Sequence, residues 1–216
     1  MILPSLLEYS IEALKAKLKI IIKNRKLIRT LQGQDDLNLH LDFVLPQFAK
    51  DRSIMTSLGL STTFKTIEQI YKNQNLYLSV HLMGEIEDLF SAYTYFENLK
   101  INPYWNYLIL VPEKYLNSWK KLGKKLGKNI IVGCWYDLNE WPEKFFTQKR
   151  MNLLMTVVAG KSGQKLQKST RDEALKMSEK YPNSHFILDG GWKTDAKCGY
   201  NTDIVSYTDF WKNIDK

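Results

Sequence analysis

The stretch LNLHLDFV, residues 37–44, has the composition of a buried β-strand, and it recurs in kind along the whole chain. Seven other runs share its richness in leucine, isoleucine, valine and aromatic residues. Several of them are apolar throughout, without strict alternation, which is typical of parallel strands buried on both faces. These runs cover residues 1–5, 76–83, 106–112, 129–136, 152–160, 185–191 and 202–208.

The segments between these runs have the apolar spacing of helices. They cover residues 11–31, 64–73, 85–99, 113–126 and 169–181. Eight strands that alternate with helices in 216 residues predict a single (β/α)8 barrel. No linker or strong repeat divides the chain, so we expect one domain over residues 1–216. A doubly wound open sheet is the alternative architecture.

Composition excludes several classes of protein. The only cysteines, Cys134 and Cys198, are far apart and form no CxxC pair, which argues against a disulfide scaffold and a thiolate zinc site. No apolar run approaches the roughly 18–20 residues that span a bilayer, so we expect no membrane association. The N-terminus MILPSLLEYS lacks a basic leader and a cleavage site. These features predict a soluble protein of the cytoplasm.

The net charge of +8 raises the question of nucleic-acid binding. The densest basic stretch, WKKLGKKLGKN at residues 119–129, has the pattern of an exposed helix face that ends at glycine. The remaining lysines are scattered along the sequence. We therefore expect no nucleic-acid partner.

Polar side chains fall where the predicted strands end, and in a (β/α)8 barrel the chemistry gathers at those carboxyl ends. Residues two apart on a strand point the same way, so His40 and Asp42 share an orientation. If they face the barrel axis, they converge with His81 and Asp189. Two imidazoles and two carboxylates suit Zn2+, Mn2+ or Fe2+. The alternative for each histidine alone is a buried, hydrogen-bonded core residue.

Five motifs, in order along nearly the whole chain, resemble those of the ribulose-phosphate 3-epimerase family. ILPSLLE (residues 2–8) resembles the family's IAPSIL segment, and HLDFVLPQF (residues 40–48) resembles HVDVMDGHF. SVHLM (residues 79–83) resembles DVHLM. LMTVVAGKSGQKL (residues 154–166) resembles VMSVNPGFGGQKF, and ILDGG (residues 187–191) resembles VDGG.

The resemblance implies a metal-dependent barrel enzyme that inverts C3 of D-ribulose 5-phosphate to give D-xylulose 5-phosphate through an enediolate. It implies one divalent metal ion, held by His40, Asp42, His81 and Asp189, and a homo-oligomeric assembly. Asp42 and Asp189 would also be the paired acid and base on opposite faces of the substrate. The remaining substrate contacts would come from Ser5, His81, Met83, Met155, Gly160, Gly163, Gly190 and Gly191.

The chain departs from the family pattern at the phosphate end. Lys161 and Ser162 replace a Phe-Gly pair, and SYTDF (residues 206–210) replaces a Gly-Ser turn, with Thr208 and Asp209 at that point. An aspartate there would repel a phosphate, although Lys161 or Lys193 would supply compensating charge. After Asp42, FVLP (residues 43–46) replaces Val-Met-Asp-Gly. Two alternatives therefore stay open: an epimerase for a different sugar or sugar phosphate, and a non-catalytic paralogue.

Overall fold

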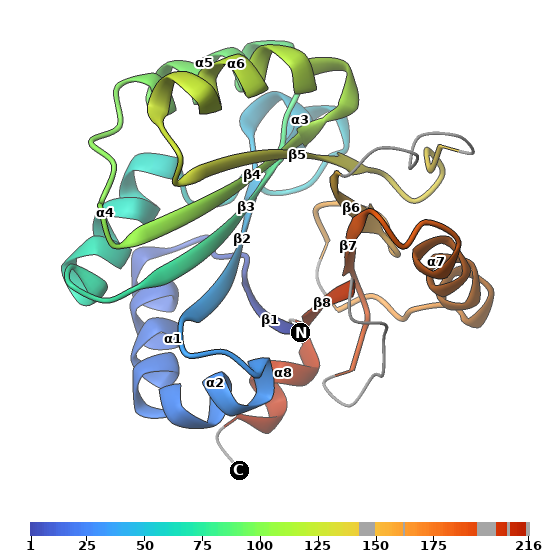
Figure 1. The fold of residues 1–216 in the computed structure, drawn as a ribbon, viewed down its shortest axis with the longest axis horizontal. Coiled ribbons are helices and arrows are strands. Elements are labelled where there is room, and N and C mark those ends of the chain that lie inside the picture. The colour runs from blue at the N-terminus through green and yellow to red at the C-terminus, as the bar shows by residue number, and fades with distance from the viewer. Residues whose placement is uncertain (143–149, 162, 194–201, 207, 215–216) are drawn as a thin grey trace.

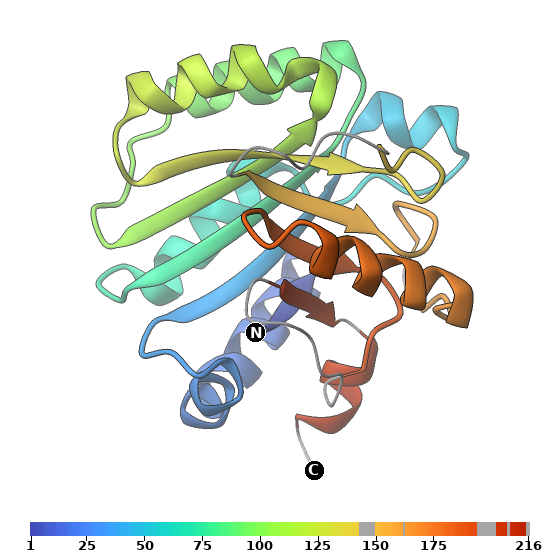
Figure 2. The ribbon, with the colours of Figure 1, turned by 45° about the vertical axis from the view of Figure 1, so that its right-hand side comes forward.

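In the computed structural model of the chain, eight parallel strands close into a barrel in the order β1 to β8 (Figures 1 and 2). The structure describes residues 1–142, 150–161, 163–193, 202–206 and 208–214. The strands are β1 Ile2–Leu6, β2 Leu37–Val44, β3 Leu76–Met83, β4 Trp105–Pro112, β5 Ile130–Tyr136, β6 Met151–Met155, β7 His185–Asp189 and β8 Thr202–Ser206. The helices are α1 Ile11–Lys23, α2 Arg25–Gln32, α3 Pro46–Asp51, α4 Leu60–Tyr71, α5 Ile86–Glu97, α6 Leu116–Leu126, α7 Lys168–Lys180 and α8 Thr208–Asn213, with a 3-10 turn η1 at Glu113–Tyr115.

The closed sheet confirms the predicted barrel and rules out the open-sheet alternative. The decisive contact is the parallel pairing of β1 with β8, in which Ile2 lies opposite Ile204. An open doubly wound sheet would leave two edges unpaired. Each of the eight predicted runs contains a strand, although β6 ends at Met155 and the rest of its predicted run forms a loop.

Side chains of the strands divide into two buried layers. On β2 the odd-numbered residues, such as Leu41, pack outward against the helices. On β3 the even-numbered apolar residues, such as Leu82, do the same. Val44 and Met83 belong instead to a second apolar cluster inside the barrel. Because orientation alternates along a strand, His40 and Asp42 share the inward direction of Val44, and His81 shares that of Met83. The alternation predicted for these pairs is confirmed.

The helices differ from expectation in two places. The predicted helix over residues 11–31 is interrupted at Asn24, whose side chain and main-chain N–H both donate to the Ile20 carbonyl and so end α1. Between β5 and β6, the described residues 137–142 and 150 form no helix, whereas a regular (β/α)8 repeat would place one there. None of the described helices is long and apolar enough to cross a membrane.

A carboxylate ties two helices together above β2 and β3. Asp88 accepts hydrogen bonds from the main-chain N–H of Glu85 at its own helix start and from those of Gln47 and Phe48 in α3. Such a cap contributes about 1 kcal/mol. It holds α3, and with it Phe48, over the carboxyl ends of these strands, where the site lies.

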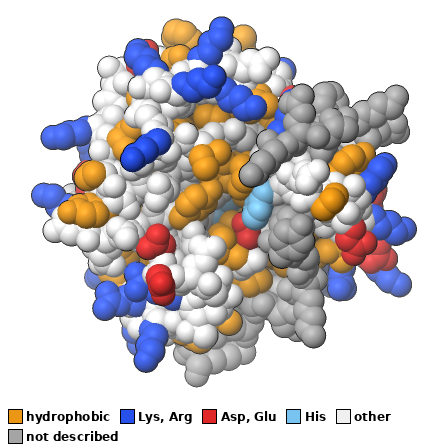
Figure 3. All heavy atoms as spheres, viewed as in Figure 1, with side chains coloured by type: hydrophobic (Ala, Val, Ile, Leu, Met, Phe, Trp, Pro, Cys, Tyr) orange, Lys and Arg blue, Asp and Glu red, His pale blue; other side chains and the backbone are white. Residues whose placement is uncertain are grey.

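Figure 3 shows one face of the molecule in space-filling form. Lysine and arginine side chains lie around its rim, with acidic side chains among them and apolar side chains nearer the centre. On this face the basic residues do not form one continuous stripe.

Candidate metal centre

The carboxyl ends of β2, β3 and β7 bring two histidines and two aspartates together. His40, Asp42, His81 and Asp189 each offer one ligand atom, and these atoms all lie within 4.8 Å of one another. Strand register produces the convergence, because Asp42 lies opposite His81 across the β2–β3 pair. Asp189 is the last residue of β7 and reaches the same point from the far side of the barrel. The predicted cluster is therefore present as a geometric fact.

The two histidines face the carboxylates through different ring nitrogens. His40 presents Nε2, which lies 3.2 Å from Asp42 Oδ1 and 3.7 Å from Asp189 Oδ2. His81 presents Nδ1, which lies 3.0 Å from Asp42 Oδ1 and 3.6 Å from Asp189 Oδ2. The four atoms thus surround a common space with two nitrogen and two oxygen donors.

Burial makes this arrangement unusual for residues that merely pack. Both imidazoles are fully buried, and Nε2 of each lacks a hydrogen-bond partner in the described part of the chain. A buried polar atom without a partner is costly. His40 Nε2 also lies close to two carboxylate oxygens, so a cation between them would satisfy all three groups. The residues present fit a divalent ion with nitrogen and oxygen ligands.

The electrostatics separate the two carboxyl groups. Burial alone would raise the pKa of Asp42, but the nearby charges of His40 and His81 and the hydrogen bond from His81 outweigh it and hold that pKa well below its usual range. Burial and the neighbouring negative charge of Asp42 raise the pKa of Asp189. Burial opposes the charge of His81, yet hydrogen bonds to Asp189 and Asp42 raise its pKa to about 9. The pKa values of the two carboxyl groups are thus shifted in opposite directions.

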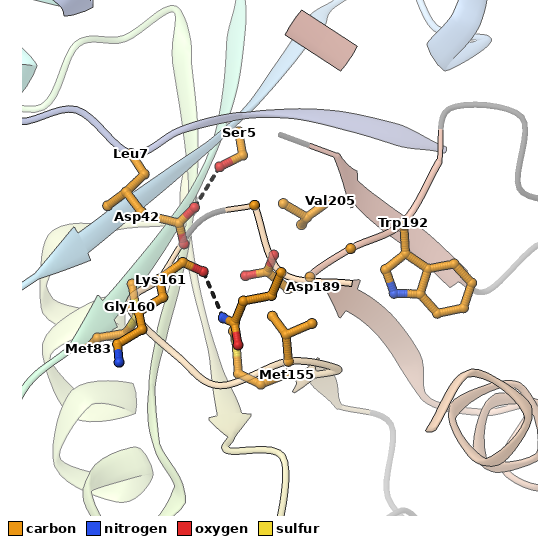
Figure 4. Close-up of a pocket in the computed structure, with 15 residues that line it drawn as sticks. Ser5, Leu7, Asp42, Met83, Met155, Gly160, Lys161, Asp189, Trp192 and Val205 are labelled. Carbon is orange, nitrogen blue, oxygen red and sulfur yellow. Dashed lines mark hydrogen bonds between the residues drawn. The ribbon is translucent and has the colours of Figure 1, made fainter. Parts of the chain in front are cut away.

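A small cavity of about 60 Å³ opens beside this cluster (Figure 4). Ser5 stands at its edge and donates a hydrogen bond of 2.6 Å to Asp42 Oδ2. Met83 and Met155, both buried, line its wall. All three residues therefore line the cavity, and their contact with a substrate stays a prediction. The remaining lining residues are Leu7, Asp42, Val157, Gly160, Lys161, Gly163, Gln164, Asp189, Gly190, Gly191, Trp192 and Val205.

The four predicted glycines lie at the rim of the same cavity, each with a positive φ. A Cβ on Gly190 would stand 2.2 Å from Val157 Cγ2, and one on Gly191 would stand 2.6 Å from the Leu166 main-chain nitrogen. These two positions require glycine for close packing as well as for conformation. A Cβ on Gly163 would meet nothing within 4 Å, so only its conformation constrains it.

Several residues that line the cavity were not predicted as site residues, although Gln164 and Leu7 lie within the quoted motifs. Gln164 binds the main chain of the β6–α7 loop, donating to the carbonyls of Val158 and Lys161. Trp192 donates to Thr156 Oγ1, which itself donates to the Asp189 or Gly190 carbonyl. Leu7 and Val205 complete the apolar wall. Ser162 and the side chains of Thr208 and Asp209 lie outside the described part of the structure.

The third histidine belongs to another part of the molecule. His185 starts β7, at the opposite end from Asp189, and its Nε2 lies 2.6 Å from Asp203 Oδ2. The Met1 amino group lies 3.2 Å from the other oxygen of Asp203. Nε2 of His185 thus has a carboxylate partner, whereas Nε2 of His40 and of His81 has no hydrogen-bond partner among the described residues.

Comparison with known proteins gives one family. A family model described as the ribulose-phosphate 3 epimerase family matches residues 15–203. No curated protein gives a significant match. Among solved structures, a chain from the tryptophan synthase a2b2 complex of the hyperthermophile Pyrococcus furiosus is similar, with 12% identity and a TM-score of 0.60. That alignment covers 99% of this chain and 89% of the other, and it supports the barrel fold alone.

Proposed function

Because the chain belongs to the ribulose-phosphate 3-epimerase family, we propose that it inverts C3 of D-ribulose 5-phosphate to give D-xylulose 5-phosphate. The observation that carries the proposal is the convergence of His40, Asp42, His81 and Asp189 on one buried space. An enzyme of this kind needs two proton-transfer groups and a source of positive charge at the same point. A non-catalytic paralogue would have no use for two buried carboxylates that lie beside the same two histidines.

The proposed reaction removes the C3 proton from one face of the sugar and returns a proton to the other. A proton beside a ketone is weakly acidic, so a carboxylate needs help to remove it at a useful rate. A divalent ion held by the four side chains would act as a Lewis acid for the charge that develops on the substrate oxygens. The chain itself supplies the two proton-transfer groups, Asp42 and Asp189.

The two aspartates would start each turnover in different states. The lowered pKa of Asp42 favours the carboxylate, which can accept the C3 proton. The pKa of Asp189 is shifted the other way, so Asp189 would be the group that returns a proton to the opposite face. The roles exchange in the reverse reaction. Ser5 holds Asp42 in place through its 2.6 Å hydrogen bond, and the methionines help exclude water.

The proposal also concerns where the phosphate group of the substrate would lie. The cavity is small, about 60 Å³, so the sugar would extend from it toward its mouth. Lys161 lies there, the one cationic side chain among the described residues that line the cavity. The main chain at Gly190 and Gly191 approaches the same mouth. These features support an anionic substrate, and a different sugar phosphate is the second candidate.

The direct test is proton exchange at C3. The protein would be loaded with Zn2+, Mn2+ or Fe2+ and incubated with D-ribulose 5-phosphate in heavy water, and NMR would follow deuterium at C3 and the appearance of D-xylulose 5-phosphate. We expect both signals in the wild type and neither in Asp42→Asn or Asp189→Asn. Asp203→Asn, a buried aspartate at the far end of the barrel, is the matched control and keeps both.

The outcomes separate the candidate functions. Exchange without the epimer would mean that one aspartate transfers protons and the other is misplaced. Exchange with another sugar phosphate, but not with D-ribulose 5-phosphate, would favour the second candidate. If the folded, metal-loaded protein catalyses neither C3 exchange nor epimerisation of any ketose phosphate, the epimerase proposal is contradicted and a binding role is favoured.

A further inference from the structure

A single polar side chain inside the barrel stands directly behind one of the histidines. Ser79 lies on β3 opposite His40 of β2, and its Oγ is 3.0 Å from His40 Nδ1. Both residues are fully buried. On its other side Ser79 lies opposite Leu108 of β4, a member of the apolar cluster within the barrel. A hydroxyl in such a place is unfavourable unless it is hydrogen-bonded, so the contact with His40 accounts for it.

The contact determines how the His40 ring is used. A neutral imidazole carries one proton, and whichever nitrogen holds it cannot also bind a metal. His40 Nε2 has no hydrogen-bond partner in the described structure and faces the two carboxylates, whereas Nδ1 faces Ser79. The arrangement is satisfied if the proton lies on Nδ1 and is donated to Ser79 Oγ, which leaves the Nε2 lone pair free.

We infer that Ser79 is a positioning residue of the metal centre, which fixes the ring orientation and the tautomer of His40. The inference rests on the metal site of the proposed function and goes beyond it, because it concerns a residue that contacts neither metal nor substrate. Histidine ligands commonly depend on such a partner at the second ring nitrogen. His81 has no comparable partner, since its Nε2 is unpartnered in the described part of the chain and its ring packs edge-to-face on Trp135.

The position has a second consequence for the charge of the site. The family motif DVHLM has an aspartate where this chain has Ser79. A hydroxyl oxygen accepts a hydrogen bond from Nδ1–H as an aspartate would, but it adds no negative charge beside the ring. The centre therefore has the two charges of Asp42 and Asp189 to balance a divalent ion, and the chain relies on hydrogen bonding alone to orient His40.

The test measures metal binding rather than turnover. Zn2+ affinity would be determined by competition with a chromophoric chelator for the wild type, Ser79→Ala and Ser79→Asp. We expect Ser79→Ala to weaken binding about 10- to 100-fold and Ser79→Asp, which keeps an acceptor, to bind at least as tightly as the wild type. The control is Ser178→Ala, a buried serine of α7 that bonds the Leu175 carbonyl and should leave the affinity unchanged.

A spectroscopic readout distinguishes positioning from packing. The chain has three histidines, so each ring can be assigned in 15N-histidine NMR spectra by single substitution. In the Zn2+-loaded wild type we expect His40 to bind through Nε2 and to keep a slowly exchanging proton on Nδ1. That proton should exchange faster in Ser79→Ala if the variant folds.

Coordination of His40 through Nδ1, or a Ser79→Ala variant that binds Zn2+ as tightly as the wild type, would overturn the inference. Neither result depends on catalysis. If the wild type binds Zn2+ but turns over no sugar, the proposed function is refuted, whereas the role of Ser79 is still decided by the Zn2+ affinities and the NMR spectra.

Discussion

The floor and the rim of the cavity are built by different means. The floor consists of His40, Asp42 and His81, which lie within long strands whose register is fixed by continuous pairing. The rim consists of glycines with positive φ in the loops after β6 and β7. Strand pairing leaves the floor little freedom, whereas the rim depends on individual side chains such as Gln164 that bind the loop main chain. We therefore expect the floor to determine the chemistry and the rim to determine which substrate enters.

The largest effect should come from breaking the floor. His81→Ala removes one of the two nitrogen ligands and the partner that hydrogen-bonds both carboxyl groups. We expect loss of stable metal binding and a fall in turnover of about 10³-fold or more, since general acid–base catalysis alone contributes about 10²–10⁴-fold. Metal content after dialysis and the rate of epimerisation measure it. His185→Ala, at the opposite end of β7, should leave metal content unchanged, and a similar loss there would contradict the distinction between the histidines.

The pH dependence of metal binding tests the same floor without substitution. Because the pKa of His81 in the metal-free protein is raised to about 9, a metal must displace its proton at neutral pH. Affinity should rise about tenfold per pH unit and level off near pH 9, or about 100-fold from pH 7. Titration of Zn2+ against a chelator buffer at each pH measures this rise.

The stability of the metal-free protein should change in the opposite direction. A histidine pKa raised above its usual 6.5 favours the protonated folded state, so this stabilisation is complete below pH 6.5 and is lost as the pH rises through about 9. The loss would be of the order of 3 kcal/mol. Denaturant unfolding of the chelator-treated protein at pH 6.5 and 9.5 would reveal it. An unfolding free energy that is flat or rises over this range would contradict a protonated His81.

Substitution of the rim glycines should lower the stability of the fold. Gly190→Ala places a Cβ 2.2 Å from Val157 Cγ2 at a φ of 115°, so packing and backbone strain both oppose it. We expect a loss of about 2–4 kcal/mol, by analogy with other overpacked and strained sites. Gly163→Ala, which meets nothing within 4 Å, should cost only about 1 kcal/mol through its φ of 77°. Thermal denaturation of both variants compares them, and equal losses would mean that close packing at Gly190 is unimportant.

The smallest effect should come from the charge at the mouth. Lys161→Met removes the one cation among the described cavity-lining residues and keeps an apolar stem. We expect KM for D-ribulose 5-phosphate to rise about tenfold with kcat nearly unchanged, because a charge-assisted hydrogen bond contributes about 1.5–3 kcal/mol. Lys165→Met, an exposed lysine of the same loop that does not line this cavity, is the control. An unchanged KM for Lys161→Met would remove this lysine from the substrate site.

The same contrast explains what the sequence could predict. The alternation of LNLHLDFV predicted that His40 and Asp42 share an orientation, because side chains alternate along a strand with a period of two. Placing them beside His81 and Asp189 also required the predicted barrel and the family motifs. The family motifs identified the glycines of the rim. Trp192, Leu7 and Val205 were not predicted as lining residues, since their approach depends on how strands distant in sequence meet around the closed barrel. The break at Asn24 was also missed, because the apolar pattern continues through it.

The family match covers the floor of the cavity more completely than the last-strand turn. It ends at residue 203, within β8 and before the segment SYTDF that replaces the expected Gly-Ser turn. It begins at residue 15, after Ser5, so the contact of that serine with Asp42 is known from the structure alone. Metal chemistry is therefore the better-supported half of the proposal, and the identity of the substrate depends on the rim.

The pairing of β1 with β8 also has a consequence for how the chain acquires its native state. Ile2 and Ile204 are joined only after a loop of some 200 residues has closed, and contacts so distant in sequence form late because chain entropy opposes them. Until then β1 and β8 present unpaired edges that can associate with other chains. During synthesis β1 emerges first and can pair with β2, which places Ser5 opposite His40, but the other edge of β1 must wait for β8. The cavity also needs Asp189 of β7 and Val205 of β8 to complete its lining. It is therefore complete only when nearly the whole polypeptide has been made, and nascent chains that stall earlier keep unpaired strand edges that favour aggregation.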